Sequence, residues 1–210
     1  MTTSNLNKNE LPRRIKRTFD VWGSVIYFDC ASGNSNDDVE SKIDSALDKV
    51  CDFFVEVDQV FSTYKPNSEI SRLRRGELKL ENSSTLFKEV WELSDHWKKL
   101  TGGAFDPWAV KDGYDPSGIV KGWAADKGIE ILKTSGATSI QINAAGDLSL
   151  AGGYPTLENP EAPWEIGIRD PDDAKVIVKI FQIRDGAIAT SGSYERGAHI
   201  IDPFTQMIAI

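Results

Sequence analysis

A repeating pattern of apolar residues near the start of the chain sets the strongest limit on its fold. Between residues 39 and 61, large apolar side chains recur every three or four positions. This spacing is typical of an amphipathic helix, which must bury its apolar stripe against other elements. The residues of the stripe are Val39, Ile43, Ala46, Leu47, Val50, Phe54, Val57 and Phe61.

Two shorter helical patterns follow, and strand-like segments come after them. One helix is predicted to begin near Ser84 and to end at Gly102 and Gly103, and another to run from Gly122 to Lys133. The segment Thr18–Cys30 is predicted to be a strand that precedes all the helices. Later strands are predicted at residues 139–142, 147–151, 164–168, 175–183, 187–190 and 198–201. Early helices followed by strands with short connections indicate an α+β fold rather than a doubly wound one.

The N-terminal segment differs in composition from the rest of the chain. Residues 1–17 hold few large apolar side chains, so we expect a disordered tail there and a folded domain over residues 18–210. No apolar stretch resembles a secretory signal or is long enough for a membrane span, and no lipobox cysteine lies near the start. With Cys30 and Cys51 expected to be free thiols, these features predict a cytoplasmic protein.

The formal net charge of −8 argues against binding to nucleic acids or to anionic membranes. Standard motif tests also fail, because the chain has no phosphate-binding loop, no dinucleotide fingerprint and no cluster of cysteine and histidine. Its two histidines are His96 and His199, and His96 is expected on the polar side of a helix.

Six compact segments rich in polar residues and glycine remain as candidates for chemistry. Each has an ordinary interpretation as a turn, a helix cap or a strand end, but six of them joining different elements favour one composite pocket. They are residues 61–72, 101–107, 115–122, 143–147, 189–196 and 199–203.

The segment 115–122 carries the clearest physical argument. Asp115, Pro116, Ser117 and Gly118 precede a predicted helix, whose free amides suit a phosphate group. Gly118 allows the backbone to approach a ligand closely, and Lys121 adds a positive charge. The alternative is an ordinary Asx turn that caps the helix, and the spacing alone leaves both interpretations open.

Taken in order, the six segments resemble the motifs of the ApbE family, the FAD:protein FMN transferases. The matching strings include FSTYKPNSEISR, TGGAFDP, DPSGIVKG and HIIDP. The resemblance extends from about Phe19 to Ile210, and the short connection that holds Trp108 and Tyr114 resembles the compact actinobacterial subgroup. It implies the ApbE fold and the transfer of FMN from FAD to a Thr or Ser hydroxyl of an acceptor flavoprotein. AMP is released, and Mg²⁺ assists the reaction.

The resemblance also implies roles for individual residues. The backbone carbonyl of Gly118 would be a metal ligand, and His199 would orient or deprotonate the acceptor hydroxyl. A histidine that ends a strand and bonds to the backbone is the alternative for His199. Contacts with FAD are implied for Trp22, Tyr64, Ala104, Phe105, Asp106, Asp115, Lys121 and Ile201.

The chain departs from the family pattern at several points. Trp22-Gly23-Ser24 replaces Met-Gly-Thr, Ala145 replaces a glycine, and Phe204-Thr205-Gln206 replaces Thr-Gly. The family also continues past the HIIDP motif to a helix whose Asp and Thr are metal ligands, so we expect an incomplete domain. The alternative function is therefore a truncated, non-catalytic homologue that binds FAD or AMP.

Overall fold

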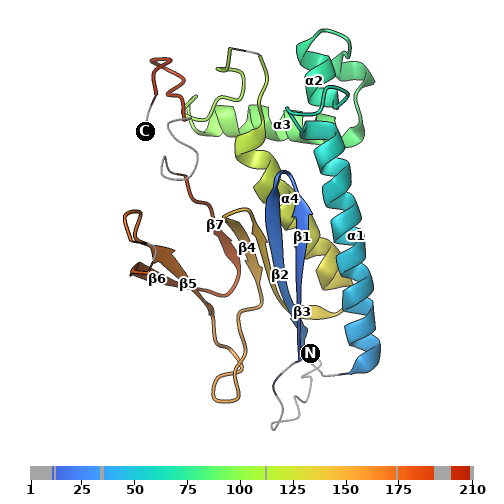
Figure 1. Cartoon of the computed structure of the whole chain (residues 1–210), viewed down its shortest axis with the longest axis vertical. Helices are drawn as coiled ribbons and strands as arrows, with labels where there is room; N and C mark the ends of the chain where they lie inside the picture. Colours follow the sequence, from blue (N-terminus) through green and yellow to red (C-terminus); the bar gives the residue numbers. More distant parts are fainter. Residues whose placement is uncertain are drawn as a thin grey trace. The chain divides into compact units, whose positions relative to one another are not determined.

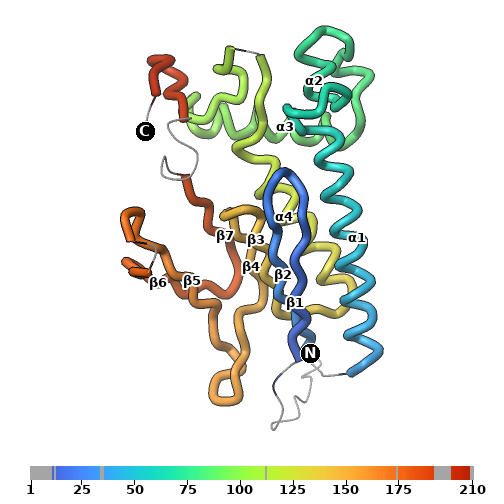
Figure 2. The backbone as a smooth tube through the Cα atoms, viewed as in Figure 1, coloured from blue at the N-terminus to red at the C-terminus, as the bar shows by residue number. Residues whose placement is uncertain are grey.

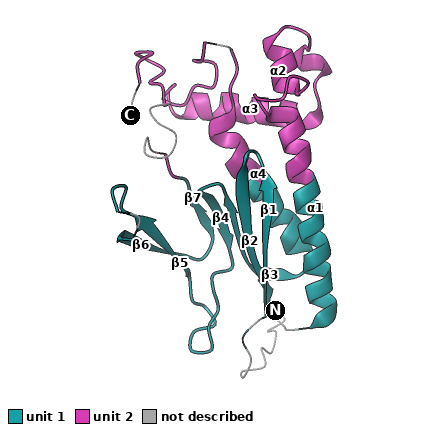
Figure 3. Cartoon of the chain, viewed as in Figure 1, with its two compact units in different colours: residues 1–52, 125–189 teal, residues 53–124, 190–210 magenta. Residues whose placement is uncertain are grey.

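The computed structural model describes residues 11, 13–33, 36–111, 113–173, 175–191 and 200–208. The chain divides into two compact units, coloured separately in Figure 3. Unit 1 comprises residues 1–52 and 125–189, and unit 2 comprises residues 53–124 and 190–210. The chain passes from unit 1 to unit 2 within helix α1 (Asp37–Phe61) and returns within helix α4 (Ser117–Thr134), where the colour changes in Figure 3. Figure 2 traces the backbone through both helices.

Unit 1 is built on a five-stranded antiparallel sheet with the order β1-β2-β3-β4-β7. Helices come early and most strands late, which confirms the predicted α+β class. The strands of this sheet are β1 (Arg14–Val21), β2 (Ser24–Ser32), β3 (Ala137–Ala144), β4 (Asp147–Ala151) and β7 (Gly186–Ile188).

The core of unit 1 lies between this sheet and two helix segments. The unit 1 parts of α1 and α4 lie along the sheet in Figure 1. Ile26 and Phe28 of β2 are fully buried, as are Ile140 and Ile142 of β3. Alternation along a strand directs these side chains to one face. The helices contribute the buried side chains Ile43, Leu47, Val50, Ile129 and Leu132.

The predicted single strand over Thr18–Cys30 is wrong, because this region is a hairpin. Trp22 and Gly23 both have positive φ, 60° and 67°, as the two-residue turn of a tight hairpin requires. Antiparallel pairing then continues as far as Arg14 opposite Ala31. Residues 14–17, which were assigned to the disordered tail, therefore form the first half of β1, while residues 1–10 and 12 lie outside the described residues.

A largely buried ion pair connects Arg14, the first residue of β1, to β2. The Nε of Arg14 lies 2.5 Å from Oδ1 of Asp29, which is itself buried in β2. The guanidinium carbon lies 4.2 Å from the ring centroid of Tyr154 and 4.9 Å from that of Trp164. Removing Asp29 would leave the Arg14 guanidinium without its carboxylate, at a cost of about 3–5 kcal/mol. Removing Arg14 should cost less, because the Lys16 ammonium still lies 3.8 Å from Oδ2 of Asp29.

Strands β5 (Trp164–Arg169) and β6 (Ile177–Ile183) form a separate two-stranded sheet. Pairing within it is antiparallel, from Trp164 opposite Ile183 onward. The outer strand and the residue before it carry apolar side chains that are largely exposed. They are Val176, Ile177, Val178, Ile180 and Phe181.

Unit 2 holds three further helical elements. They are α2 (Glu69–Arg74), a single 3-10 turn at Leu80–Asn82 and α3 (Thr85–Leu100). The predicted start of α3 is confirmed, because the Ser84 side chain accepts a hydrogen bond from the Phe87 amide. The glycines predicted to end α3, Gly102 and Gly103, both have positive φ.

Two helices differ from the sequence prediction, each for a local reason. Helix α2 is only six residues long, too short for an apolar period to reveal it, and its start is fixed by the capping side chain of Ser68. Helix α4 begins at Ser117 rather than Gly122, because Asp115 accepts the Ser117 amide and the Pro116 carbonyl accepts the Val120 amide. Gly118 and Lys121 therefore lie inside the helix rather than before it.

The two cysteines, Cys30 and Cys51, are both buried and unpaired, as expected. Of the helices in the part of the chain that the structure describes, none is both long and apolar enough to cross a bilayer. The last predicted strand, residues 198–201, lies largely outside the described residues, and Ile201 makes only an isolated bridge with Ile208.

Replacing Phe87 with alanine should destabilise the protein by about 3–5 kcal/mol, because the ring is fully buried and stacks on Phe61 at 5.5 Å. Chemical denaturation measures the change in the free energy of unfolding. Leu157→Ala is the control, since this leucine is 60% exposed and should change stability by less than about 0.5 kcal/mol. Equal effects of the two substitutions would contradict the assigned core.

Candidate functional site

Unit 2 contains the described parts of four of the six candidate segments. These are residues 61–72, 101–107, 115–122 and 200–203. The segment 143–147 and Trp22 belong to unit 1. His199, the predicted catalytic residue, and most of the segment 189–196 lie outside the described residues.

Asp115 connects three parts of unit 2. Its amide donates to the Pro107 carbonyl at 2.7 Å, which joins the 101–107 segment to the start of α4. Its Oδ2 lies 3.1 Å from the Arg74 guanidinium of α2. Arg74 also donates from Nε to the Tyr114 carbonyl at 2.9 Å. A carboxylate and a guanidinium therefore fix the ends of two helices next to each other.

The second carboxylate oxygen of Asp115 caps helix α4. Oδ1 accepts hydrogen bonds from the amide and the hydroxyl of Ser117. This is the Asx turn that was the alternative to a phosphate-binding loop. Phosphate binding at this turn stays a prediction, while the cap itself is part of the structure.

Phe105 and Gly118 are brought into direct contact. A Cβ added at Gly118 would lie 3.1 Å from Cε2 of Phe105, so the absence of a side chain lets the ring lie against the first turn of α4. Gly118 is exposed and Lys121 is partly buried on the same helix. Two residues predicted to contact FAD or a metal thus belong to one local surface.

Tyr64 projects from a tightly bonded turn. The Ser68 hydroxyl donates to the carbonyls of Ser62 and Lys65 at 2.7 and 2.9 Å, and the Lys65 ammonium lies 2.5 Å from Asp58. The Tyr64 side chain is nevertheless 96% exposed. A rigid turn that carries an exposed ring is suited to contact a flat ligand.

Asp106 is held by groups on both sides. The Lys98 ammonium of α3 lies 2.8 Å from its Oδ2, and the Trp108 amide donates to its Oδ1 at 2.9 Å. Its neighbours Ala104 and Phe105 are exposed and partly buried, respectively. The carboxylate of Asp106 is therefore ordered by the protein itself.

The residues after His199 form a compact turn. Asp202 accepts from the amides of Phe204 and Thr205 at 2.8 and 3.4 Å, and these hydrogen bonds lower the pKa of Asp202. Ile201 pairs with Ile208. The Phe204 ring lies 3.6 Å from where a Cβ on Gly103 would be, which places this turn against the 101–107 segment.

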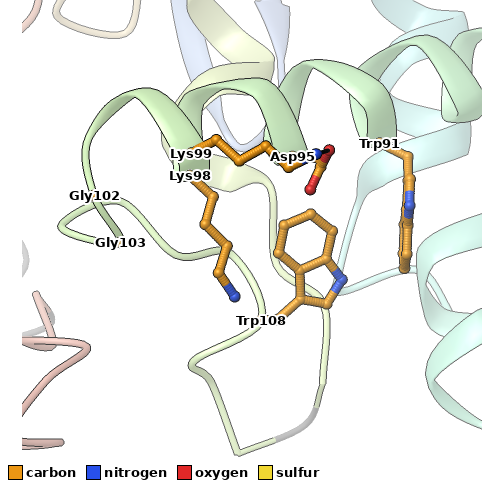
Figure 4. Close-up of a pocket in the computed structure, with 7 residues that line it drawn as sticks. All are labelled: Trp91, Asp95, Lys98, Lys99, Gly102, Gly103 and Trp108. Carbon is orange, nitrogen blue, oxygen red and sulfur yellow. Dashed lines mark hydrogen bonds and ion pairs between the residues drawn. The ribbon is translucent and has the colours of Figure 1, made fainter.

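An open pocket of about 540 Å³ adjoins the 101–107 segment. Figure 4 shows Lys98 and Trp91 extending from α3 on either side of the Trp108 indole. Sequence reasoning noted Trp108 but did not assign it a role, and it missed the other side chains of this pocket. The lining residues are Trp91, Asp95, Lys98, Lys99, Gly102, Gly103 and Trp108.

Three aromatic rings support this pocket. Trp91 lies 5.1 Å from Trp108 and 4.5 Å from Tyr114, measured between ring centroids. Tyr114 is almost fully buried, and its hydroxyl lies 2.7 Å from the Ser94 hydroxyl. Burial raises the pKa of Tyr114 to about 12.

A magnesium site is not assembled from the described residues. Among them, no group of three or more acidic, histidine or cysteine side chains is positioned to hold a metal ion. The predicted ligand, the Gly118 carbonyl, offers one oxygen, whereas Mg²⁺ takes six in octahedral geometry. The described residues would therefore supply at most part of the coordination of such an ion, and the substrate phosphates and water would have to supply the rest.

The order of the segments and the fold that they form are those of one protein family. The model of the ApbE family matches residues 23–111 and 111–209, and the chain belongs to this family. Its fold is that of the flavin transferase ApbE from Vibrio cholerae, with a TM-score of 0.72 and 21% identity over 93% of this chain and 78% of that one. The apo flavinyl transferase ApbE of Pseudomonas stutzeri has the same fold, with a TM-score of 0.75 and 20% identity. That match covers 93% of this chain and 76% of the other.

Two curated relatives are named FAD:protein FMN transferase. The one from Vibrio cholerae is 35% identical over 100 residues, and the one from Treponema pallidum is 33% identical over 104 residues. Each match covers 43% of this chain and 29% of the relative. The aligned part of the chain thus spans less than a third of the length of these proteins.

Stability should fall as the pH rises from about 10 to about 12, in part because of Tyr114. Because burial raises the pKa of Tyr114, the folded protein favours the neutral phenol. The resulting contribution to the free energy of unfolding is complete below the ordinary pKa of tyrosine and is lost as the pH rises through the pKa of the folded protein. Urea unfolding at pH 9 and pH 11.5 measures the effect. Tyr114→Phe should reduce the loss on going to high pH, and an identical loss in the two proteins would contradict the assignment.

Proposed function

We propose that this chain carries out, or forms the main part of, Mg²⁺-assisted transfer of FMN from FAD to a protein hydroxyl. The acceptor is a Thr or Ser of a target flavoprotein, and AMP is the second product. Membership of the ApbE family and the names of the curated relatives, FAD:protein FMN transferase, support this function.

The observation that carries the proposal is the set of contacts that gathers family motifs within unit 2. Asp115 contacts Pro107 of one motif, and Phe105 of that motif lies against Gly118. Phe204, which follows another motif, lies over Gly103. Segments far apart in the sequence thus share one surface, as residues that bind a single extended nucleotide must.

The reaction breaks one phosphoanhydride bond. The acceptor oxygen attacks the phosphorus on the riboflavin side, the bond from that phosphorus to the bridging oxygen breaks, and AMP leaves with the bridging oxygen. The hydroxyl proton must be taken up by a base, for which we propose His199. Positioning and charge neutralisation supply most of the rate in such phosphoryl transfers.

Within this proposal the described residues bind and orient FAD. Asp115 is rigidly held by Arg74 and Ser117, so its remaining capacity as an acceptor has a fixed direction. Lys121 adds positive charge near the phosphates. Tyr64 offers an exposed ring, and the other proposed contacts are Trp22, Ala104, Phe105, Asp106 and Ile201.

Mg²⁺ would neutralise the diphosphate when bound, and it commonly uses substrate phosphates and water as ligands. The Gly118 carbonyl is the ligand that we propose from this chain. Adding EDTA should therefore abolish transfer, and restoring excess Mg²⁺ should recover it.

The transfer test combines the chain with FAD, MgCl₂ and a flavoprotein acceptor that has a candidate threonine. We expect a fluorescent acceptor band that survives a denaturing gel, with one AMP released for each flavin attached. The same acceptor with valine in place of that threonine should remain unlabelled. Labelling of both acceptors would contradict transfer to the hydroxyl.

Two further outcomes would replace this function. FAD binding without transfer would identify the chain as a nucleotide-binding module, and AMP release without an acceptor would identify a hydrolase.

Asp115→Asn should weaken FAD binding about tenfold or more, the usual loss for a charged hydrogen bond. Glu158→Gln removes the same charge from an exposed loop of unit 1 and should leave the affinity unchanged.

A further inference from the structure

The pocket beside α3 is made of residues that the family motifs leave unassigned. Trp91, Lys98 and Lys99 come from the helix that precedes one motif, and Trp108 comes from the connection that follows it. Only Gly102 and Gly103 belong to a motif. The pocket therefore adjoins the proposed FAD contacts without repeating them.

Its charges are balanced within the protein. The Lys98 ammonium lies 2.8 Å from Asp106, and the Lys99 ammonium lies 2.5 Å from Asp95. A phosphate group would have to compete with these carboxylates for the lysines. A neutral ligand edge that both donates and accepts hydrogen bonds is better suited to such paired groups.

Its walls favour a flat ring. The Trp108 indole is partly exposed, and the Lys98 ammonium lies over the ring, 5.3 Å from its centroid. A flat ligand that stacks on this face would displace the Lys98 ammonium to its edge. Trp91 meets it edge-on, with an angle of 79° between the ring planes, which fixes the orientation of the Trp108 ring (Figure 4). The two glycines contribute no side chain to the lining, and the Phe204 ring lies 3.6 Å from the position that a Cβ on Gly103 would take.

The pocket is also joined to the proposed FAD contacts. Asp106 accepts a hydrogen bond from the Trp108 amide and forms an ion pair with Lys98. One carboxylate therefore orders both the residue that carries the indole and the ammonium beside it. Ala104 and Phe105 lie between the glycines and Asp106 in sequence. A nucleotide bound along residues 104–106 would reach this pocket with one of its ring systems.

We infer that this pocket binds a heteroaromatic ring of FAD, stacked on Trp108, with the paired side chains of Asp95, Lys98 and Lys99 at its edge. The inference rests on the proposed function and adds the residues that hold one ring. Isoalloxazine and adenine share the required chemistry, since both are flat, neutral and carry hydrogen-bonding edges.

The test is a set of titrations of the full chain with FAD, riboflavin and adenosine. Trp108→Leu should weaken FAD binding about fivefold to a hundredfold, the range for loss of one stacked ring. Trp108→Phe keeps a ring and should retain most of the affinity. Trp97→Leu is the matched control, because Trp97 lies exposed on α3 outside the pocket and its loss should change affinity less than twofold.

The phosphate-free probes identify the ring. Loss of riboflavin binding in Trp108→Leu, with loss of the fluorescence quenching that a stacked indole causes, would assign the pocket to isoalloxazine. Loss of adenosine binding would assign it to adenine. Thermal melting of each variant separates these effects from unfolding. If the leucine variant does not fold, Trp108→Phe decides the case for isoalloxazine, because it should keep the affinity for riboflavin and lose the fluorescence quenching that the stacked indole causes.

Failure of this inference is distinct from failure of the proposed function. If FAD binds, Asp115→Asn weakens it and neither Trp108 variant does, the pocket assignment is overturned while the function stands. If the unmodified chain does not bind FAD at all, both are overturned.

Discussion

The packing of aromatic rings on α3 is the interaction on which the arrangement of unit 2 depends. Phe87 stacks on Phe61 of α1 and meets Tyr114 edge-on at 5.9 Å, while Trp123 of α4 meets Phe61 at 6.2 Å. Large rigid rings lose little conformational entropy on burial and fix the helices that carry them. Since Tyr114 is one of these rings, the position of the neighbouring Asp115 follows from the core rather than from a mobile loop.

Much of the fold was predictable because its signals are local. The spacing of apolar residues predicted α1, and Ser84 predicted the start of α3. The strand predicted over residues 147–151 is β4. The presence of six polar segments that join different elements also predicted that distant segments converge. The contacts of Asp115 with Pro107 and of Phe105 with Gly118 show that convergence for two of them.

What could not be predicted depends on partners far away in the sequence. Arg14 is ordered by Asp29, Tyr154 and Trp164, so a basic residue in a polar lead-in gave no local sign of a strand. The pocket likewise requires Trp91 and Trp108 to meet, which no spacing reveals. Asp115 was ambiguous because one side chain can both cap a helix and bind a ligand.

The outer strand of the small sheet in unit 1 has a practical consequence. Strand β6 and the residue before it, Val176, hold five exposed apolar side chains. Among the described strands, β6 pairs with β5 alone. Open apolar strand edges are templates for pairing between molecules, and natural sheets usually protect them with charge, proline or a bulge. Lys179 is the one charged residue within β6. Association through this edge would increase with protein concentration, so purification and assays of this polypeptide are best done in dilute samples.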